Sequence, residues 1–549
     1  MSEAADFDAL AGEFFAVWLR YHPEAALRAG IVEFNVVLPA QSDDDQAALA
    51  GLLETLIVAL EEMDYAALDA ERRLDLELMF ALARAEHREL LEHDWRHRDP
   101  LAHLPVGLIH RLTLAPLENL RGALVPLLRA LPDHLRLALT QLQPTAALLV
   151  PPVLLRATIA AARDGREYLR ALARSRWLRS RCSGTGEIEH LAESAGAALR
   201  HYAEALERDI APLAAAPPGC GEDRLRLLLA RRHWLEIDPQ ACIGLLDELA
   251  ADCEQLLARL PAPPAEEAIG EVALADRLRG ECRAIAARLD ALGVRLPPNP
   301  LRIAGGPAAP HSGGSGIDYV ADLRTGAGLL YLAAGDGRHD GAATGLPTGA
   351  ELRLRCLRLG WGGDHALAFG GGMAARSLPR RTACGQTLRV GSALCLETRL
   401  LGASADPAER HAVLRARRQA IVAARVDLQL NRGAIGIDDA IAALRESGED
   451  ETAGLCRAAG MLRRPGDALA GVLGWRLIEA LMAGAADAHP GGTQVPGSTP
   501  FDPLLLERLR SRGPIPLALA IRHGLGEDAW QRAAAALGCV TPQSMMDMS

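Results

Sequence analysis

Lysine is absent from this 549-residue chain, whose 59 basic residues are all arginine. Without a lysine amine the protein cannot form a Schiff base, hold a cofactor on lysine or use the lysine of a Walker A phosphate loop. Aromatic residues make up only 4% of the sequence, so alanine, leucine and valine must fill the interior. Side chains this small favour closely packed helices.

Paired cysteine motifs and long apolar runs are also missing. The ten cysteines include no C-x-x-C spacing, which favours buried thiols in a reducing compartment over a disulfide framework or a zinc ribbon. The stretch MSEAADFDALAGEFF starts acidic and lacks the apolar segment of a signal peptide. The most apolar window, TAALLVPPVLL, is short and broken by prolines. We therefore expect a cytoplasmic protein that does not bind a membrane.

The overall charge balance argues against a nucleic-acid partner. The formal net charge is −11 and the basic residues form no long block interleaved with aromatics. A hydrophobic content of 49% with 23% charged residues is typical of a globular protein. The chain is too long for one ordinary core, so we expect more than one subdomain.

Helical periodicity dominates the chain and predicts a mainly α-helical protein. A stretch rich in proline and glycine interrupts it, and two apolar segments that follow, IDYVADLR and GLLYLAAG, predict one small antiparallel sheet. The predicted organisation has three segments: an N-terminal helical region over residues 1–295, a linker with the sheet over 296–350, and a C-terminal helical region over 351–549.

The segment LGWGGDHALAFGGG, residues 359–372, carries Asp364 and His365 among glycines between two predicted helices. It can be interpreted as the remnant of a metal site, a phosphate loop or a turn. A phosphate loop is disfavoured because the glycines do not follow a strand that opens a βαβ unit. Asp364, His365 and Glu397 could together bind a divalent ion, although catalysis would also need a general base near the metal-bound water.

Two further groups deserve comparison with this candidate. His93 and His97 have the i, i+4 spacing of a metal pair on a helix, but surface histidines at a helix end fit the neighbouring sequence better. Cys356 and Cys395 lie near His365 in the sequence and could form a Cys–His pair. Buried small thiols are the commoner role for such cysteines.

Several stretches, in order, resemble the bacterial family called domain of unknown function 885 (DUF885). They include FFAVWLRYHPEAALRAG, LDLELMFALARAEHRELLEHDWRHRDPLAHL and LPDHLRLALTQLQPTAALLVPPVLLRATIAAARDG, followed by LRARRQAIVAARVDLQLNRGAIGIDDAIAAL, MLRRPGDALAGVLGWRLIEAL and LLLERLRSRGPIPL. The resemblance covers nearly the whole chain. It implies a helical, zincin-like fold related to the carboxypeptidase Taq class.

Family members with an intact site carry His-Glu-x-x-Pro-Gly-His-His-Leu-Gln, and later Glu-Gly-Trp-Ala-Leu-Tyr-Ala-Glu. Here LGWGGDHALA and VGSALCLE fall on these motifs. His365 and Glu397 match the family pattern. The resemblance implies four lost residues, at positions occupied here by Leu359, Gly360, Ala366 and Val390. In order, these positions correspond to the first His, the Glu that acts as the general base, the last His of the first motif and the opening Glu of the second motif.

Losses continue downstream of the two motifs. A Val-Asp-x-x-x-His pattern keeps Asp427 but has Asn431 in place of the histidine. An Arg-Tyr pair is replaced by Gly460 and Met461, and a later tyrosine by Gly471. The resemblance therefore implies a degenerate metal site.

Three functional hypotheses follow from this degenerate site. The first is a non-hydrolytic protein without a cofactor, whose cleft binds a peptide or small molecule or whose surface binds a protein partner. The second is an enzyme that uses Asp364, His365 and Glu397, or a Cys–His pair, in a metal-dependent hydrolysis or altered chemistry; zinc bound by His365 and Glu397 would then be the cofactor. The third is a working site elsewhere, for example at His93 and His97.

Overall fold

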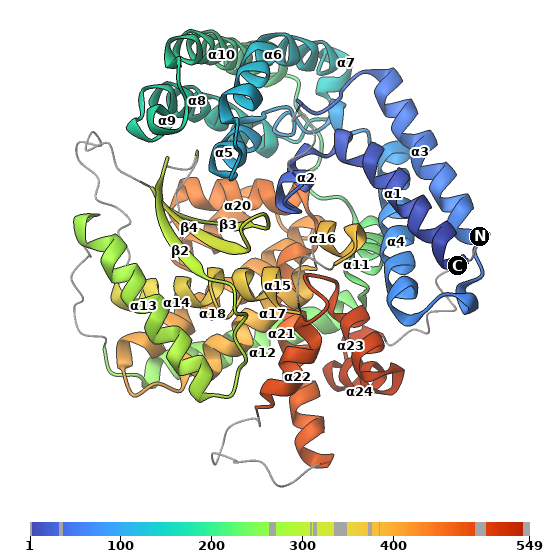
Figure 1. Cartoon of the computed structure of the whole chain (residues 1–549), viewed down its shortest axis with the longest axis vertical. Helices are drawn as coiled ribbons and strands as arrows, with labels where there is room; N and C mark the ends of the chain where they lie inside the picture. Colours follow the sequence, from blue (N-terminus) through green and yellow to red (C-terminus); the bar gives the residue numbers. More distant parts are fainter. Residues whose placement is uncertain are drawn as a thin grey trace. The chain divides into compact units, whose positions relative to one another are not determined.

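The structure is a computed structural model, and it describes residues 3–31, 37–262, 271–307, 310, 316–333, 348–371, 376–383, 385–488 and 501–541 (Figure 1). The chain forms two compact units. Unit 1 contains Met1–Pro218, Arg302–Gly345 and Leu455–Ala459, and unit 2 contains Gly219–Leu301, Leu346–Gly454 and Gly460–Ser549. Both units are built from separate stretches of sequence, unlike the three contiguous segments that the sequence predicts.

Unit 1 consists mainly of helices joined by short turns, together with most of a three-stranded sheet. Its elements are α1 (Glu3–Tyr21), α2 (Pro23–Arg28), α3 (Asp43–Glu61), η1 (Tyr65–Ala67), α4 (Ala70–Glu92), η2 (Trp95–His97), α5 (Val106–Leu114), α6 (Leu120–Gln141), α7 (Pro144–Ala147), α8 (Pro152–Arg174), α9 (Arg176–Arg181), α10 (Thr185–Ala205), η3 (Leu206–Ile210), β2 (Leu301–Gly306), β3 (Ile317–Asp322) and β4 (Ala327–Ala333).

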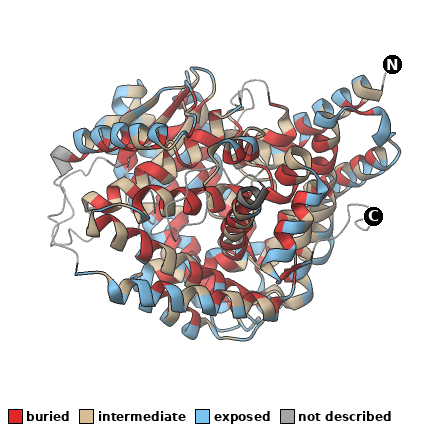
Figure 2. Cartoon of the chain, turned by 90° about the horizontal axis from the view of Figure 1, so that it is seen from below, coloured by how far each residue is buried: buried red, intermediate tan, exposed pale blue. Residues whose placement is uncertain are grey.

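Amphipathic helices form the core of unit 1. Helix α10 packs against α6 and α8, and Figure 2 shows buried and exposed faces alternating along such helices. The buried positions of α10 recur every three or four residues, as one face of a helix requires: Ile188, Ala192, Ala195, Leu199 and Tyr202. Glycine at position 196 allows α10 and α8 to pack closely. A Cβ added there would lie only 3.3 Å from Cγ of Arg166 on α8.

The predicted strand pair is confirmed. Strands β3 and β4 are antiparallel, with Val320 opposite Leu329 and Asp318 opposite Tyr331. The sequence did not reveal β2, which pairs with β4 to give the order β2-β4-β3. Its segment, LRIAGG, is short and ends in glycines, so it lacks the run of β-branched and aromatic residues that predicts a strand.

Unit 2 contains the helices of the C-terminal half and several that precede the three-stranded sheet. Its elements are α11 (Glu222–His233), β1 (Glu236–Ile237), α12 (Pro239–Arg259), α13 (Glu271–Ala291), α14 (Gly349–Leu359), α15 (Asp364–Phe369), α16 (Leu378–Thr382), α17 (Gln386–Glu397), η5 (Thr398–Gly402), α18 (Pro407–Asn431), α19 (Ile437–Glu446), α20 (Glu451–Arg463, partly in unit 1), α21 (Asp467–Ala488), α22 (Pro503–Arg510), α23 (Leu517–Leu525), α24 (Glu527–Leu537) and β5 (Val540–Thr541).

Helices α17 and α21 approach each other through glycines. A Cβ added at Gly391 would lie 2.5 Å from the carbonyl carbon of Gly474, and one added at Gly474 would lie 1.9 Å from the carbonyl oxygen of Thr387. Helix α18 packs against α12 and α21. The fixed α17–α21 spacing holds the end of α17, where Glu397 lies.

The mainly helical class predicted from the sequence is confirmed, but the prediction of a single small sheet is wrong. A second sheet pairs β1 with β5, placing Glu236 opposite Thr541 and Ile237 opposite Val540. Two-residue strands far apart in the sequence have no periodicity from which to predict them. Within the described residues, no helix has the length and apolar character needed to cross a membrane.

The α17–α21 contact predicts opposite effects of alanine at two glycines of α21. Gly474→Ala should lower the free energy of unfolding by about 1–3 kcal/mol, because its methyl group would overpack the Thr387 backbone. The control Gly484→Ala lies at an exposed position with nothing within 4 Å of an added Cβ. It should raise stability by up to about 1 kcal/mol. Denaturant midpoints measure both, and equal effects would contradict the assigned contact.

Candidate functional site

The glycine-rich segment is a turn that separates two helices. Helix α14 ends at Leu359, and α15 starts at Asp364. A Cβ added at Gly363 would lie 1.8 Å from the carbonyl oxygen of Arg358, so the turn requires glycine there. The turn's N–H groups bond to the chain itself: Gly362 donates to the Leu357 carbonyl at 3.0 Å, and Gly363 to that of Gly360 at 3.2 Å. These N–H groups do not form a phosphate cradle.

His365 is fully buried on α15 among aromatic rings. Its ring makes an edge contact with Trp361, with centroids 4.7 Å apart, and lies 5.0 Å from the ring of Phe369. Nε2 donates to the carbonyl oxygen of Asn299 at 3.0 Å. Burial lowers the pKa of His365 to about 4, so the imidazole is neutral at pH 7.

Each of the two carboxylates near His365 in the predicted site is bound by an arginine. Asp364 accepts from Nε of Arg389 at 2.6 Å and from Nη2 at 2.9 Å. Glu397, which is 1% exposed, accepts from Nε of Arg358 and from its Nη2 at 2.9 Å. Both pairs are two-pronged, the geometry in which a guanidinium binds a carboxylate most strongly.

Because of these ion pairs the two carboxylates are not free to bind a metal. A divalent ion would first have to displace a guanidinium from each of them. In the described part of the chain, no three His, Cys, Asp or Glu side chains form a group that could hold a metal ion. Asp364, His365 and Glu397 therefore do not converge as a three-ligand set.

Asp427 has a different environment from the other candidate residues. It is fully buried on α18 and accepts from the backbone N–H of Gly466 at 3.1 Å and of Ala468 at 3.0 Å. Burial raises the pKa of Asp427 to about 7, against the opposing effect of these hydrogen bonds. Asn431, one turn later, donates to Oδ1 of Asp427 at 2.9 Å. Asp427 thus caps the N-terminus of α21, and Asn431 bonds to the capping carboxylate.

The other positions at which the resemblance implies a lost residue lie at packing contacts or on the surface. Val390 faces Gly471, where an added Cβ would lie 2.8 Å from Cγ1 of the valine. Ala366 and Met461 are buried, whereas Gly460 is exposed. Leu359 and Gly360 lie on the α14 side of the turn, so a continuous helix does not join them to His365.

The two cysteines near His365 in the sequence are not activated nucleophiles. Cys395 is buried beside the sulfur of Met482, at 4.0 Å, and burial raises the pKa of its thiol to about 12. Cys356 lies 4.0 Å from the carbonyl oxygen of Leu278, and contact with Cys282 together with burial raises the pKa of its thiol. Both thiols stay protonated at neutral pH, whereas a nucleophile needs the thiolate.

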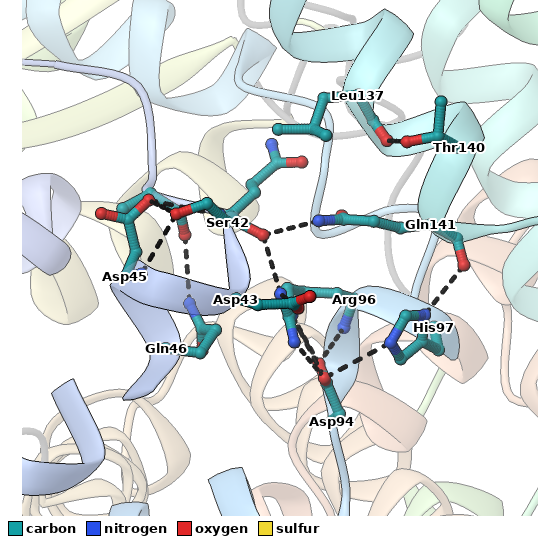
Figure 3. Close-up of polar contacts among 12 residues, drawn as sticks. Ser42, Asp43, Asp45, Gln46, Asp94, Arg96, His97, Leu137, Thr140 and Gln141 are labelled. Carbon is teal, nitrogen blue, oxygen red and sulfur yellow. Dashed lines mark hydrogen bonds and ion pairs between the residues drawn. The ribbon is translucent and has the colours of Figure 1, made fainter. Parts of the chain in front are cut away.

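His93 and His97 do not share one helix, in line with the sequence-based preference for histidines at a helix end over a metal-binding i, i+4 pair. Helix α4 ends at Glu92, and a separate 3-10 turn, η2, follows it. The Asp94 side chain caps the start of η2 by accepting from the backbone N–H of Arg96. Nδ1 of His97 donates to the Gln141 carbonyl oxygen at 2.8 Å, while Nε2 lies 3.5 Å from Asp94 (Figure 3). Arg96 binds the same Asp94 carboxylate. These contacts describe a structural network.

The residues that the sequence did not reveal are the arginine partners. Arg358 and Arg389 lie 39 and 25 residues from the carboxylates they bind. Because all 59 basic residues are arginine, residue type alone does not show which of them bind the candidate carboxylates. Only the arrangement of α14, α15 and α17 identifies these two.

The fold and the arginine-bound carboxylates define a mainly helical protein with an incomplete metal-ligand set in its described residues. A similar fold occurs in a candidate lipoprotein of unknown function from Shewanella oneidensis, with a TM-score of 0.68, 13% identity, and coverage of 94% of this chain and 98% of that one. A candidate lipoprotein from Colwellia psychrerythraea matches with a TM-score of 0.73, 15% identity, and coverage of 95% and 99%.

The sequence comparison identifies the family. The family model for bacterial proteins of unknown function, DUF885, matches residues 23–322, and the chain belongs to this family. The matched residues end before the glycine turn at 360–363. A search of curated proteins found no match.

The Glu397–Arg358 pair predicts a large cost for removing its cation. Arg358→Met should lower the free energy of unfolding by roughly 3 kcal/mol, because the nearly buried Glu397 carboxylate loses its partner. The double variant Arg358→Met/Glu397→Gln should recover part of this loss, since the remaining group is neutral.

The matched control is Arg279→Met, which breaks an exposed ion pair with Asp276 on α13 and should cost less than about 1 kcal/mol. Urea unfolding of the variants measures all three effects. Equal losses in Arg358→Met and Arg279→Met would contradict the role of the buried pair.

Proposed function

We propose that this protein is a non-hydrolytic member of the DUF885 family, which has lost zinc-peptidase chemistry and retains a cleft for a peptide or small-molecule ligand or a surface for a protein partner. The observation that carries the proposal is the pairing of both candidate metal carboxylates, Asp364 and Glu397, with arginines. A guanidinium supplies the positive charge of a metal ion but cannot activate a water molecule.

A zincin-like ancestry for the site is part of this proposal. Such a site needs paired ligands on one continuous helix and a general base near the metal. The glycine turn between α14 and α15 and the glycine at 360, where the family resemblance places the glutamate base, both support the loss of this chemistry. The overall fold is nevertheless shared with proteins of 13–15% identity, so the fold persists without the catalytic residues.

The competing hypothesis is a metal-dependent hydrolase or an enzyme of altered chemistry that uses Asp364, His365 and Glu397. It would need the three side chains to act on one substrate. Separate arginine partners for the two carboxylates weigh against it, as does the incomplete ligand set. Cytoplasmic location also stays a prediction, since the two structural neighbours are described as candidate lipoproteins.

Metal content and peptidase activity test the proposal directly. Protein purified without a histidine tag should contain far less than one zinc per chain by inductively coupled plasma mass spectrometry. It should also fail to cleave a fluorogenic peptide library when zinc, manganese or cobalt is added, because the described residues hold no complete metal-ligand set.

His365→Ala provides the matched variant for this test. The metal content of this variant should equal that of the unmodified protein. Near-stoichiometric zinc, together with peptide cleavage that disappears in His365→Ala, would overturn the non-hydrolytic proposal and support the hydrolase.

A further inference from the structure

Two arginines beside α15 are buried without a carboxylate partner in the described residues. Arg376, which follows α15, is 8% exposed, and Arg510, the last residue of α22, is 6% exposed. Burying a charge is costly unless an opposite charge or a full set of hydrogen bonds compensates it. These two side chains therefore differ from Arg358 and Arg389, which are paired with acids.

The hydrogen bonds of Arg376 go to backbone carbonyls. Its Nη1 donates to Leu367 at 2.8 Å, and its Nη2 donates to Gly370 and, at 3.3 Å, to Ser511. Its Nε is buried without a hydrogen-bond partner. Gly513 leaves room for the guanidinium, because an added Cβ would lie 2.6 Å from Nη1.

Arg510 makes fewer hydrogen bonds to the described residues than Arg376 does. Among the described residues it donates only from Nη2 to the carbonyl oxygen of Trp361, at 3.4 Å. Among the described residues, the acidic group that acts on Arg510 is Cys395, whose thiol has a pKa raised by burial to about 12 and is therefore neutral at pH 7. No other hydrogen bond joins this guanidinium to the part of the chain that the structure describes.

The described neighbours of Arg376 and Arg510 do not offset their positive charge. Burial, and then repulsion from Arg380, lowers the pKa of Arg376 to about 10, and burial lowers the pKa of Arg510 to about 10. Both remain protonated at pH 7. Asp364 and Glu397, the acids of the candidate site, are already bound by Arg389 and Arg358.

The two guanidiniums border the candidate site itself. Arg510 binds the carbonyl of Trp361 within the glycine turn, three residues before Asp364. Arg376 binds carbonyls at the other end of α15. Ser511 links the two arginines, because it directly follows Arg510 in the sequence and its carbonyl oxygen accepts from Nη2 of Arg376.

We propose that Arg510, with Arg376 beside it, is an anion-binding subsite that takes a carboxylate or phosphate group of the ligand. This inference rests on the proposed binding function and names the ligand class: a molecule with an accessible oxyanion. Guanidinium forks bind both groups in the same two-pronged geometry. The oxyanion supplies the counter-charge that the described residues do not.

Isothermal titration calorimetry of the full chain tests this subsite in buffer with EDTA. Inorganic phosphate and succinate are titrated separately at constant ionic strength. At least one should bind, and Arg510→Met should weaken that binding by at least about tenfold, since it removes a charge-assisted contact. Arg510→Lys should retain part of the affinity, and Arg279→Met should behave as the unmodified protein.

Each outcome has a definite reading. Phosphate binding alone identifies a phosphorylated ligand, succinate binding alone a carboxylate ligand, and binding of both an oxyanion site of broad selectivity. Binding of neither anion, or equal binding by Arg510→Met, overturns the subsite. If Arg510→Met does not fold, thermal unfolding of the unmodified protein decides: the midpoint should rise with phosphate or succinate but not with chloride.

Failure of this subsite and failure of the proposed function are distinguishable. Stoichiometric zinc with peptidase activity would overturn the non-hydrolytic function whatever the anion result. Absence of anion binding in a metal-free, inactive protein would overturn only the oxyanion subsite.

Discussion

The ion pair between Glu397 and Arg358 is the interaction on which the candidate site depends. Glu397 is 1% exposed, and a carboxylate at that depth requires a cation bonded to it. Arg358 supplies it from the last turn of α14, which ties the start of the glycine turn to the end of α17. The charge is thus neutralised by the protein itself, and the site has no electrostatic need for a metal ion.

Other buried carboxylates of unit 2 are also bound by arginines. Glu409, buried on α18, is bound by Arg288 at 2.9 Å and by Arg353 at 3.2 Å, and Arg353 also binds Glu281 at 3.0 Å. Arginine suits such positions because its planar fork presents several donors in fixed directions and keeps its charge when buried. In this chain without lysine, guanidiniums bind the buried acids Glu281, Glu397 and Glu409, so buried arginines that bind no acid among the described residues stand out.

Much of the fold was predictable from the sequence, and much of the site was not. Helical periodicity predicted the mainly α-helical class, and the apolar segments at 317–322 and 327–333 predicted their antiparallel pairing. The short strands β1 and β5 escaped prediction because two residues define no period. Asp364, His365 and Glu397 were recognised as a group, but their partners were not, because an ion pair depends on how α14, α15 and α17 meet in space.

The sequence by itself determined most of the helices and the place of the glycine turn, and it carries leucine, glycine and alanine at 359, 360 and 366, where the family resemblance predicts His, Glu and His. These are local properties: periodicity, backbone freedom and the presence or absence of an ionisable group. Only the tertiary structure decided that Asp364 and Glu397 bind arginines, that Asp427 caps α21, and that Arg376 and Arg510 are buried without an acid in the described residues. The reason is physical: burial and charge pairing depend on distances between segments far apart in the chain, and folding alone sets those distances.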